Sequence, residues 1–213
     1  RSRRSRKWWA GFVLQIPVMK QMLLPVVVLG LAGLAYGGQA PGRGGQGVQP
    51  GQQVKPGLFV IAGAGANSLV RVTPDGVILI DTKLPGEQNY TGLVEQIKAV
   101  TDKPVKFTMV THHHADHTGN VDRFIAAGVP VLGHANLAAN AATYNNTPKP
   151  APPNQTYPGR DFVERLGGVT VEAHHFGRSH TSGDSIIYFP DLKVVALSDA
   201  LTTGGQGPLI DYA

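Results

Sequence analysis

The sequence predicts an α/β (α+β) fold in which helices cover β-sheets, and three observations lead to this class. With 213 residues, one domain with a sizeable core is expected. Between residues 77 and 144, apolar runs typical of buried strands alternate with segments of helical periodicity, which is the pattern of helices packed on a sheet. Short strands joined by tight turns are predicted on both sides of this stretch.

Order is expected to begin near Leu58, where apolar and β-branched runs are separated by turn residues. Pro74-Asp75-Gly76 forms the turn between the second and third strands. A helix is predicted over Gln88–Val100, since its apolar side chains recur on one face. The three strands before it are Leu58–Ala62, Ser68–Thr73 and Val77–Asp81.

The middle of the chain carries the strand–helix alternation. Val105–Val110 is a continuous, largely apolar run and is expected to be a central strand. Asn120–Ala127 reads as a helix, Val129–Gly133 as a strand and Ala135–Tyr144 as a second helix. Asn145–Gly159 contains five prolines and is expected to be an exposed connection, either a plain one or a border of a substrate groove.

Four more strands are predicted in the last third of the chain. Gly167-Gly168 turns the first pair, and a glycine-rich stretch separates that pair from the second. The strands are Phe162–Leu166, Val169–His175, Ser185–Phe189 and Lys193–Leu197.

The basic charge of the chain is concentrated in a leader, residues 1–40. Six of the 19 basic residues lie there and no acidic residue does, which leaves 13 basic and 14 acidic residues in the remainder. No nucleic-acid partner is therefore expected for the folded part. The absence of Cys excludes disulfides and thiolate ligands.

The leader is predicted to be an upstream extension followed by a signal peptide over residues 19–40. The apolar run Leu23–Tyr36 follows Lys20, and Gly38-Gln39-Ala40 provides small residues for cleavage. Because the run has only 14 residues, a cleaved signal with a periplasmic or secreted product is favoured over a membrane anchor, the alternative. Residues 41–56, rich in Gly, Pro and Gln, are expected to be a flexible linker before the domain at 57–213.

A cluster of potential metal ligands follows the central strand. Thr111–Asn120 reads T-H-H-H-A-D-H-T-G-N and contains His112, His114, Asp116 and His117. If the chain stays extended, side chains two residues apart share one face, and a turn at Thr118-Gly119 brings His117 to the same place. Imidazole and carboxylate together suit zinc or a related divalent ion.

This H-x-H-x-D-H stretch resembles the signature of the metallo-β-lactamase superfamily, and the resemblance extends from about Gly57 to the end of the chain. It implies an αββα sandwich with the metal ligands on loops at one edge of the two sheets. His112 and His114 are implied ligands of a first metal, and Asp116 and His117 of a second. His113 matches no ligand position.

Further residues gain a role from the same resemblance. The string G-R-S-H-T-S-G-D at 177–184 looks like the family's second signature and implies His180 as the third ligand of the first metal. Asp199 matches the carboxylate that bridges both metals. Asp81 is implied to support the ligands, or it caps a turn. Thr181 and Asp184 orient His180 by hydrogen bonds, or they form a tight turn. His134, His174 and His175 match no ligand position and are interpreted as ordinary polar residues at element ends.

The chain departs from the family after Asp199. A final metal-binding His, usually in a P-G-H-G-like string, has no counterpart before Ala213. The expectation is a fragment or truncated product whose sandwich lacks its C-terminal elements.

The function predicted is an exported zinc-dependent hydrolase with two metal ions per complete chain. A water held by the metal has its pKa lowered to about 7 and supplies the hydroxide that attacks a carbonyl carbon. Asp116 aligns this hydroxide and carries its proton onward. A β-lactam, a lactone and a thioester all fit as small-molecule substrates, as in class-B β-lactamases or glyoxalase II.

Three alternatives remain open on the sequence. One is an iron-dependent persulfide dioxygenase, and another is a phosphodiesterase or nuclease, which the near-neutral domain disfavours. The third is a metal-binding but inactive fragment. The ligands also accept iron or manganese.

Overall fold

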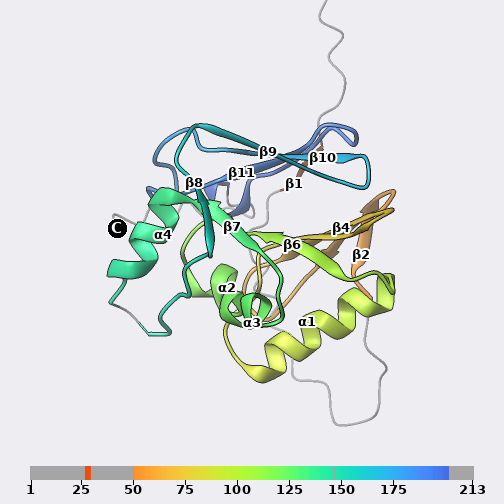
Figure 1. Cartoon of the computed structure of the whole chain (residues 1–213), viewed down its shortest axis with the longest axis horizontal. Coiled ribbons are helices and arrows are strands. Elements are labelled where there is room, and N and C mark those ends of the chain that lie inside the picture. Colours follow the sequence, from red (N-terminus) through yellow and green to blue (C-terminus); the bar gives the residue numbers. More distant parts are fainter. Residues whose placement is uncertain (1–26, 30–49, 146, 202–213) are drawn as a thin grey trace, which may run out of the picture.

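The structure, a computed structural model, describes residues 27–29, 50–145 and 147–201, and it contains two β-sheets packed face to face (Figure 1). The larger sheet has seven strands in the order β2-β3-β4-β5-β6-β7-β8. Its first four strands are antiparallel and its last four are parallel, with β5 common to both parts. The strands are β2 (Gln52–Lys55), β3 (Leu58–Ile61), β4 (Ser68–Thr73), β5 (Gly76–Ile80), β6 (Val105–Met109), β7 (Val131–His134) and β8 (Gln155–Tyr157).

The smaller sheet has five strands in the order β1-β12-β11-β10-β9. All of its pairs are antiparallel except β1 with β12, which is parallel. The strands are β1 (Val27–Leu29), β9 (Asp161–Leu166), β10 (Val169–His174), β11 (Ile186–Phe189) and β12 (Val194–Ala196).

Helices lie against the larger sheet. In Figure 1, α1, α2 and α3 lie on the side of this sheet that faces away from the smaller one, and α4 lies beside β7 and β8. They are α1 (Glu87–Val100), α2 (Ala115–Thr118), α3 (Val121–Ala126) and α4 (Ala135–Thr143), and a 3₁₀ turn, η1, spans Ser198–Ala200. No helix within the described ranges is long and apolar enough to cross a membrane.

The core has two layers because β5 is buried on both faces. Ile78 and Ile80 point into the cluster between the sheets, while Val77 and Leu79 point into the cluster under the helices. This alternation follows from the period of two along a strand. In β10 only alternate residues are buried, as expected for a sheet with one covered face. The predicted mixed α/β fold is confirmed, and the described residues supply both sheets and one helical layer of the expected αββα sandwich.

Several segment predictions need correction. Residues 52–55, expected in the flexible linker, form β2 and pair with β3. The proline-rich connection contains β8, which pairs with β7 and buries Tyr157, whose hydroxyl lies 2.7 Å from Ser185 Oγ. The helix predicted at Asn120–Ala127 is preceded by a separate short helix, α2.

The leader lies outside the described residues, except for 27–29. These three residues fall within the predicted signal peptide and form β1 at the edge of the smaller sheet. The linker residues before 50 and the last residues, 202–213, also lie outside the described ranges.

Candidate metal centre

The predicted ligands gather where the parallel strands end. β6 leads into Thr111 and the histidine run, and α2 follows immediately. The ligands of this loop are met by a turn between β10 and β11 that carries His180, and by η1 after β12, which carries Asp199. Three separate segments therefore supply the site, one after a parallel strand of the larger sheet and two after strands of the smaller sheet that pair antiparallel with β11.

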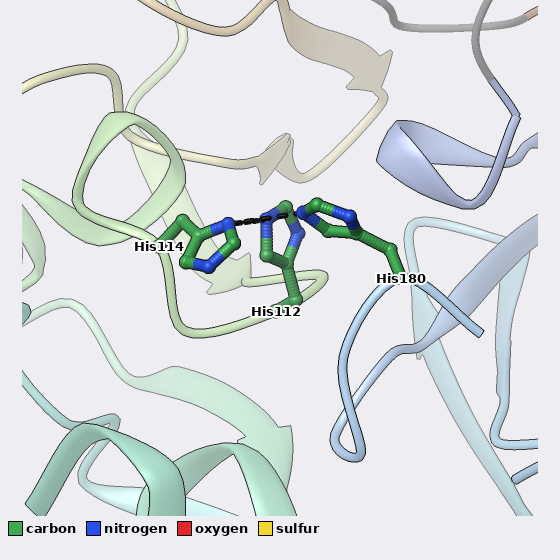
Figure 2. A group of neighbouring side chains, drawn as sticks. All are labelled: His112, His114 and His180. Atoms are coloured by element: carbon green, nitrogen blue, oxygen red, sulfur yellow. Dashed lines mark hydrogen bonds between the residues drawn. The ribbon is translucent and has the colours of Figure 1, made fainter. Parts of the chain in front are cut away.

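His112, His114 and His180 form the first group. One ring nitrogen from each can be chosen so that all three lie within 4.8 Å of one another. His114 Nδ1 lies 3.1 Å from His112 Nε2 and 3.0 Å from His180 Nε2. Figure 2 shows the rings of His114 and His180 approaching from two loops, with His112 between them.

His112, His117 and Asp199 form a second group, in which one possible ligand atom from each residue lies within 4.8 Å of the other two. His117 is fully buried, and its Nε2 lies 3.5 Å from Asp199 Oδ1. His112 thus belongs to both groups, whereas the family resemblance implies it only for the first metal. The rings of His112 and His117 are 4.0 Å apart between centroids, which explains the shared position.

Asp116 does not lie where the extended-chain argument places it. Helix α2 begins at Ala115, so Asp116 and His117 are successive helical residues and do not alternate along a strand. The Thr118 hydroxyl donates to the carbonyls of His113 and His114, which stabilises this turn. Asp116 Oδ2 is 3.6 Å from His117 Nε2, and Asp116 is in neither group.

Their surroundings shift the pKa values of the two buried imidazoles, His112 and His117, in opposite directions. Burial and the neighbouring imidazoles, His117 first among them, hold the pKa of His112 well below its usual value, so this ring is neutral and retains a lone pair. Burial by itself would lower the pKa of His117, but the carboxylates, led by Asp81, raise it to about 10. Burial would raise the pKa of Asp199, yet hydrogen bonding to His117 and its charge lower it.

Asp81 connects the two strands beneath the site. It follows β5 with φ of 61° and is fully buried. Its carboxylate accepts from Thr111 N at 2.8 Å and lies 2.8 Å from His117 Nδ1. Thr111 Oγ1 lies 2.9 Å from both Asp81 Oδ2 and Ser198 Oγ. Thr111 and Ser198 were not predicted as site residues, because a lone hydroxyl in a sequence carries no signal.

Thr181 and Asp184 form a closed turn beside His180. Asp184 accepts from the backbone N–H of Thr181 at 2.9 Å and from its hydroxyl at 2.5 Å. Gly183 packs on α4 so closely that a Cβ there would lie 2.5 Å from Leu137 N. These contacts position His180 through the backbone of the turn.

His113, predicted to match no ligand position, is fully buried with its ring edge-on to Tyr144, 5.1 Å between centroids. It belongs to neither ligand group among the described residues.

Lys83 is a further buried group that sequence reasoning missed. Its side chain is 1% exposed, and Nζ donates to the carbonyl of Ile61 and, at 2.8 Å, to that of Ala66. These carbonyls are the two ends of the β3–β4 loop. Gly65 in this loop lies against Asp116, since a Cβ on Gly65 would be 2.7 Å from Asp116 Cβ. Lys83 therefore holds the loop that covers the predicted ligand Asp116.

The Lys83→Met variant is expected to remove a pH dependence of stability. Burial lowers the pKa of Lys83 to about 7, although Asp81 acts in the opposite direction. Between that pH and the unfolded value of about 10.4, the unfolded chain holds more protons at this position, so stability rises with pH in this window. From pH 7 to pH 9 the wild-type protein should gain about 2 kcal/mol relative to the variant.

Urea unfolding followed by circular dichroism at both pH values, with a chelator present, measures this difference. His117 contributes with the opposite sign, because its raised pKa gives stability that is lost as pH rises towards 10. Only the difference between wild type and variant isolates Lys83. Equal pH slopes for the two proteins would contradict the prediction.

The donor set fits a divalent cation. The imidazoles of His112, His114 and His180 converge, with 3.0 and 3.1 Å between their nitrogens, and His112 is held in the unprotonated form that binds metals. His117 Nε2 is buried without a hydrogen bond of ordinary geometry. Zinc prefers imidazole and carboxylate ligands of this kind.

Two packed sheets with a histidine- and aspartate-rich centre at one edge define a metal-binding α/β sandwich. The chain belongs to the metallo-beta-lactamase superfamily, whose family model matches residues 61–212. The predicted family is confirmed.

Relatives and solved structures agree with this assignment. The chain is 28% identical to 2,4-dinitroanisole O-demethylase subunit alpha from Nocardioides sp. (strain JS1661) over 102 residues. This matched region covers 48% of this chain and 31% of that protein. It is 29% identical over 134 residues to metallo-beta-lactamase IND-1 from Chryseobacterium indologenes, covering 61% of this chain and 52% of the relative. The chain thus spans about a third of the length of the first of these curated relatives and about half of the length of the second.

The fold is shared with a metallo-beta-lactamase from Pontibacter korlensis, with a TM-score of 0.64 and 23% identity over 73% of this chain and 74% of that one. The crystal structure of metallo-beta-lactamase IND-7 matches with a TM-score of 0.60 and 22% identity, over 74% and 72% of the two chains.

Proposed function

We propose that the chain is the metal-binding part of a zinc-dependent hydrolase that cleaves a carbonyl-type bond in a small molecule. The observation that carries this proposal is the convergence of His112, His114 and His180, next to a second group that shares His112. A β-lactam, a lactone and a thioester are the candidate bonds. The similarity to proteins named metallo-beta-lactamases supports the β-lactam in particular.

Each of the two ligand groups is proposed to hold one metal ion. His112, His114 and His180 would hold one ion, and His112, His117 and Asp199 would offer ligands to a second. A metal bound there supplies Lewis acidity and a water molecule of lowered pKa. Asp81 keeps the His117 ring in place through the 2.8 Å contact with Nδ1, which leaves Nε2 for the site.

Asp116 is the proposed proton acceptor. Its side chain is 37% exposed, whereas that of Asp199 is 19% exposed and that of Asp81 is fully buried. A group that exchanges protons with the medium needs this access, and a carboxylate within reach of the reacting atoms is suited to the role.

Export from the cytoplasm is part of the proposal and rests on the sequence of residues 19–40. A basic residue, an apolar run and small residues follow one another there in the order of a signal peptide. A mature protein starting after Ala40 would have no stable association with the membrane.

The experiment is metal analysis of the purified protein together with hydrolysis of nitrocefin, a lactone and a glutathione thioester. Zinc in the protein and turnover of one substrate are expected. Asp199→Asn should lower both, while Asp191→Asn, a matched change at a carboxylate paired with Arg71, should lower neither. Iron in place of zinc, with no hydrolysis, would favour the dioxygenase alternative. Metal without turnover would indicate an inactive fragment.

A further inference from the structure

A hollow of about 670 Å³ lies beside the candidate metal centre, and the proposed hydrolysis does not use it. This volume lies within the range of small-molecule sites, about 300–1,000 Å³. Its walls come from the end of β7, the start of α4, the segment before β9 and the end of β10. Three histidines were interpreted from the sequence as ordinary polar residues. Two of them, His134 and His175, line the hollow, and the third, His174, contacts its Phe176.

Planar side chains dominate the hollow. The rings of His134 and His175 are stacked, 3.8 Å between centroids and 19° between planes. Phe176 extends the aromatic surface and is 64% exposed, one of only three large apolar side chains exposed in the described part of the chain. The ring of His174 stacks on Phe176 at 5.7 Å. An exposed phenylalanine beside stacked rings gives a planar ligand a surface to pack against.

The charge of the hollow is positive. Arg160 is its cation, with the guanidinium 5.0 Å above the Phe176 ring. None of the described residues that line the hollow is acidic. The nearby carboxylate of Asp161 lies 2.7 Å from His174 Nδ1 but 3.9 Å from Arg160 Nε, so its closer partner is the histidine. The Arg160 side chain is 70% exposed and has donors available to an anion.

The hollow adjoins the turn that carries His180. The ring of His175 lies with Nδ1 2.8 Å from the carbonyl oxygen of Asp184, and Asn136 Nδ2 donates to the carbonyl of Ser182 at 3.1 Å. Both His175 and Asn136 line the hollow. A ligand there would rest on side chains that brace the metal-binding turn.

We infer that this hollow is a binding site for a small aromatic carboxylate, separate from the metal centre. The ring of the ligand packs on Phe176 and the His175 imidazole, and its carboxylate pairs with the Arg160 guanidinium. The combination of a planar apolar surface and one exposed cation selects against both neutral aromatic and non-aromatic anionic molecules.

Isothermal titration with phenylacetate, and with neutral phenylacetamide as the matched ligand, tests this inference on the purified chain. Phenylacetate is expected to bind saturably with a Kd of roughly 1 mM, and phenylacetamide at least about 5-fold more weakly, since one charge-assisted contact is lost. Arg160→Gln and Phe176→Leu should each weaken phenylacetate binding at least about 5-fold. Arg165→Gln, an exposed arginine on the same hairpin, is the control and should leave the Kd unchanged.

The same titration with His180→Ala separates the hollow from the metal centre. Binding at the hollow should persist in this variant, whereas a carboxylate bound to the metal would be lost with it. Equal affinity of wild type and Arg160→Gln, loss of binding in His180→Ala, or no saturable binding to wild type would each overturn the inference. Unchanged circular dichroism of the variants shows that any loss is local. Because the readout is binding, failure of the proposed hydrolase activity would leave the result interpretable.

Discussion

Replacement of His112 by alanine is expected to abolish the binding of both metal ions, because this imidazole belongs to both ligand groups. His180→Ala and His117→Ala remove a ligand from one group each and should leave one ion per chain. Hydrolysis by His112→Ala should fall roughly 10³-fold or more, since the metal contributes several kcal/mol of transition-state stabilisation. Elemental analysis of the three variants, with parallel kinetics, measures both effects.

The matched control is His174→Ala, which removes a histidine that contacts Asp161 and Glu172 in the smaller sheet and should keep the wild-type metal content. If His112→Ala retained one ion per chain, as His180→Ala is expected to do, the shared role of His112 would be wrong. His112 would then serve the first metal alone, as the family resemblance implies.

Asp81→Ala should lower the free energy of unfolding by about 3 kcal/mol or more, because it removes one partner of a fully buried network. The Thr111 N–H and the His117 ring would lose their acceptor. The backbone at this position has φ of 61°, which alanine tolerates poorly. Urea unfolding of the metal-free protein measures the loss.

Asp81→Asn separates charge from shape. Asparagine adopts positive φ and keeps an acceptor for Thr111, so its stability loss should be smaller than that of Asp81→Ala. It lacks the charge that faces His117, and metal affinity should fall about 10- to 100-fold, the usual effect of losing a partner that orients a ligand. Wild-type metal affinity in Asp81→Asn would mean that Asp81 serves only the fold.

The elements that the sequence predicted well are those whose signal is local. β4, β5 and β6 follow from apolar runs next to turn residues, and α1 follows from one apolar face. β2 and β8 were missed because each depends on pairing with a strand elsewhere in the sheet. Their own residues, glutamines in one case and a proline-rich context in the other, predict no strand.

The sequence by itself determined the family of the protein, and it singled out the five residues that form the two ligand groups. The spacing of His112, His114, Asp116 and His117 is a property of six consecutive residues, His180 lies within a second recognisable string, and Asp199 comes just after the last predicted strand. The tertiary structure decided how these residues are grouped. It places His112 in both groups, next to the His117 ring, and it places Asp116 on α2, whose turn is stabilised by hydrogen bonds from Thr118.

Of the residues that hold the site in place, the family resemblance implied Asp81, whereas only the tertiary structure revealed Thr111, Ser198 and Lys83. Asp81 contacts His117 across 36 positions, and Thr111 contacts Ser198 across 87. Lys83 holds the loop over Asp116 by bonding carbonyls 22 and 17 positions away. Contacts of this kind form only when distant strands pack together, and a buried lysine or a lone hydroxyl has no periodicity that could reveal them in advance.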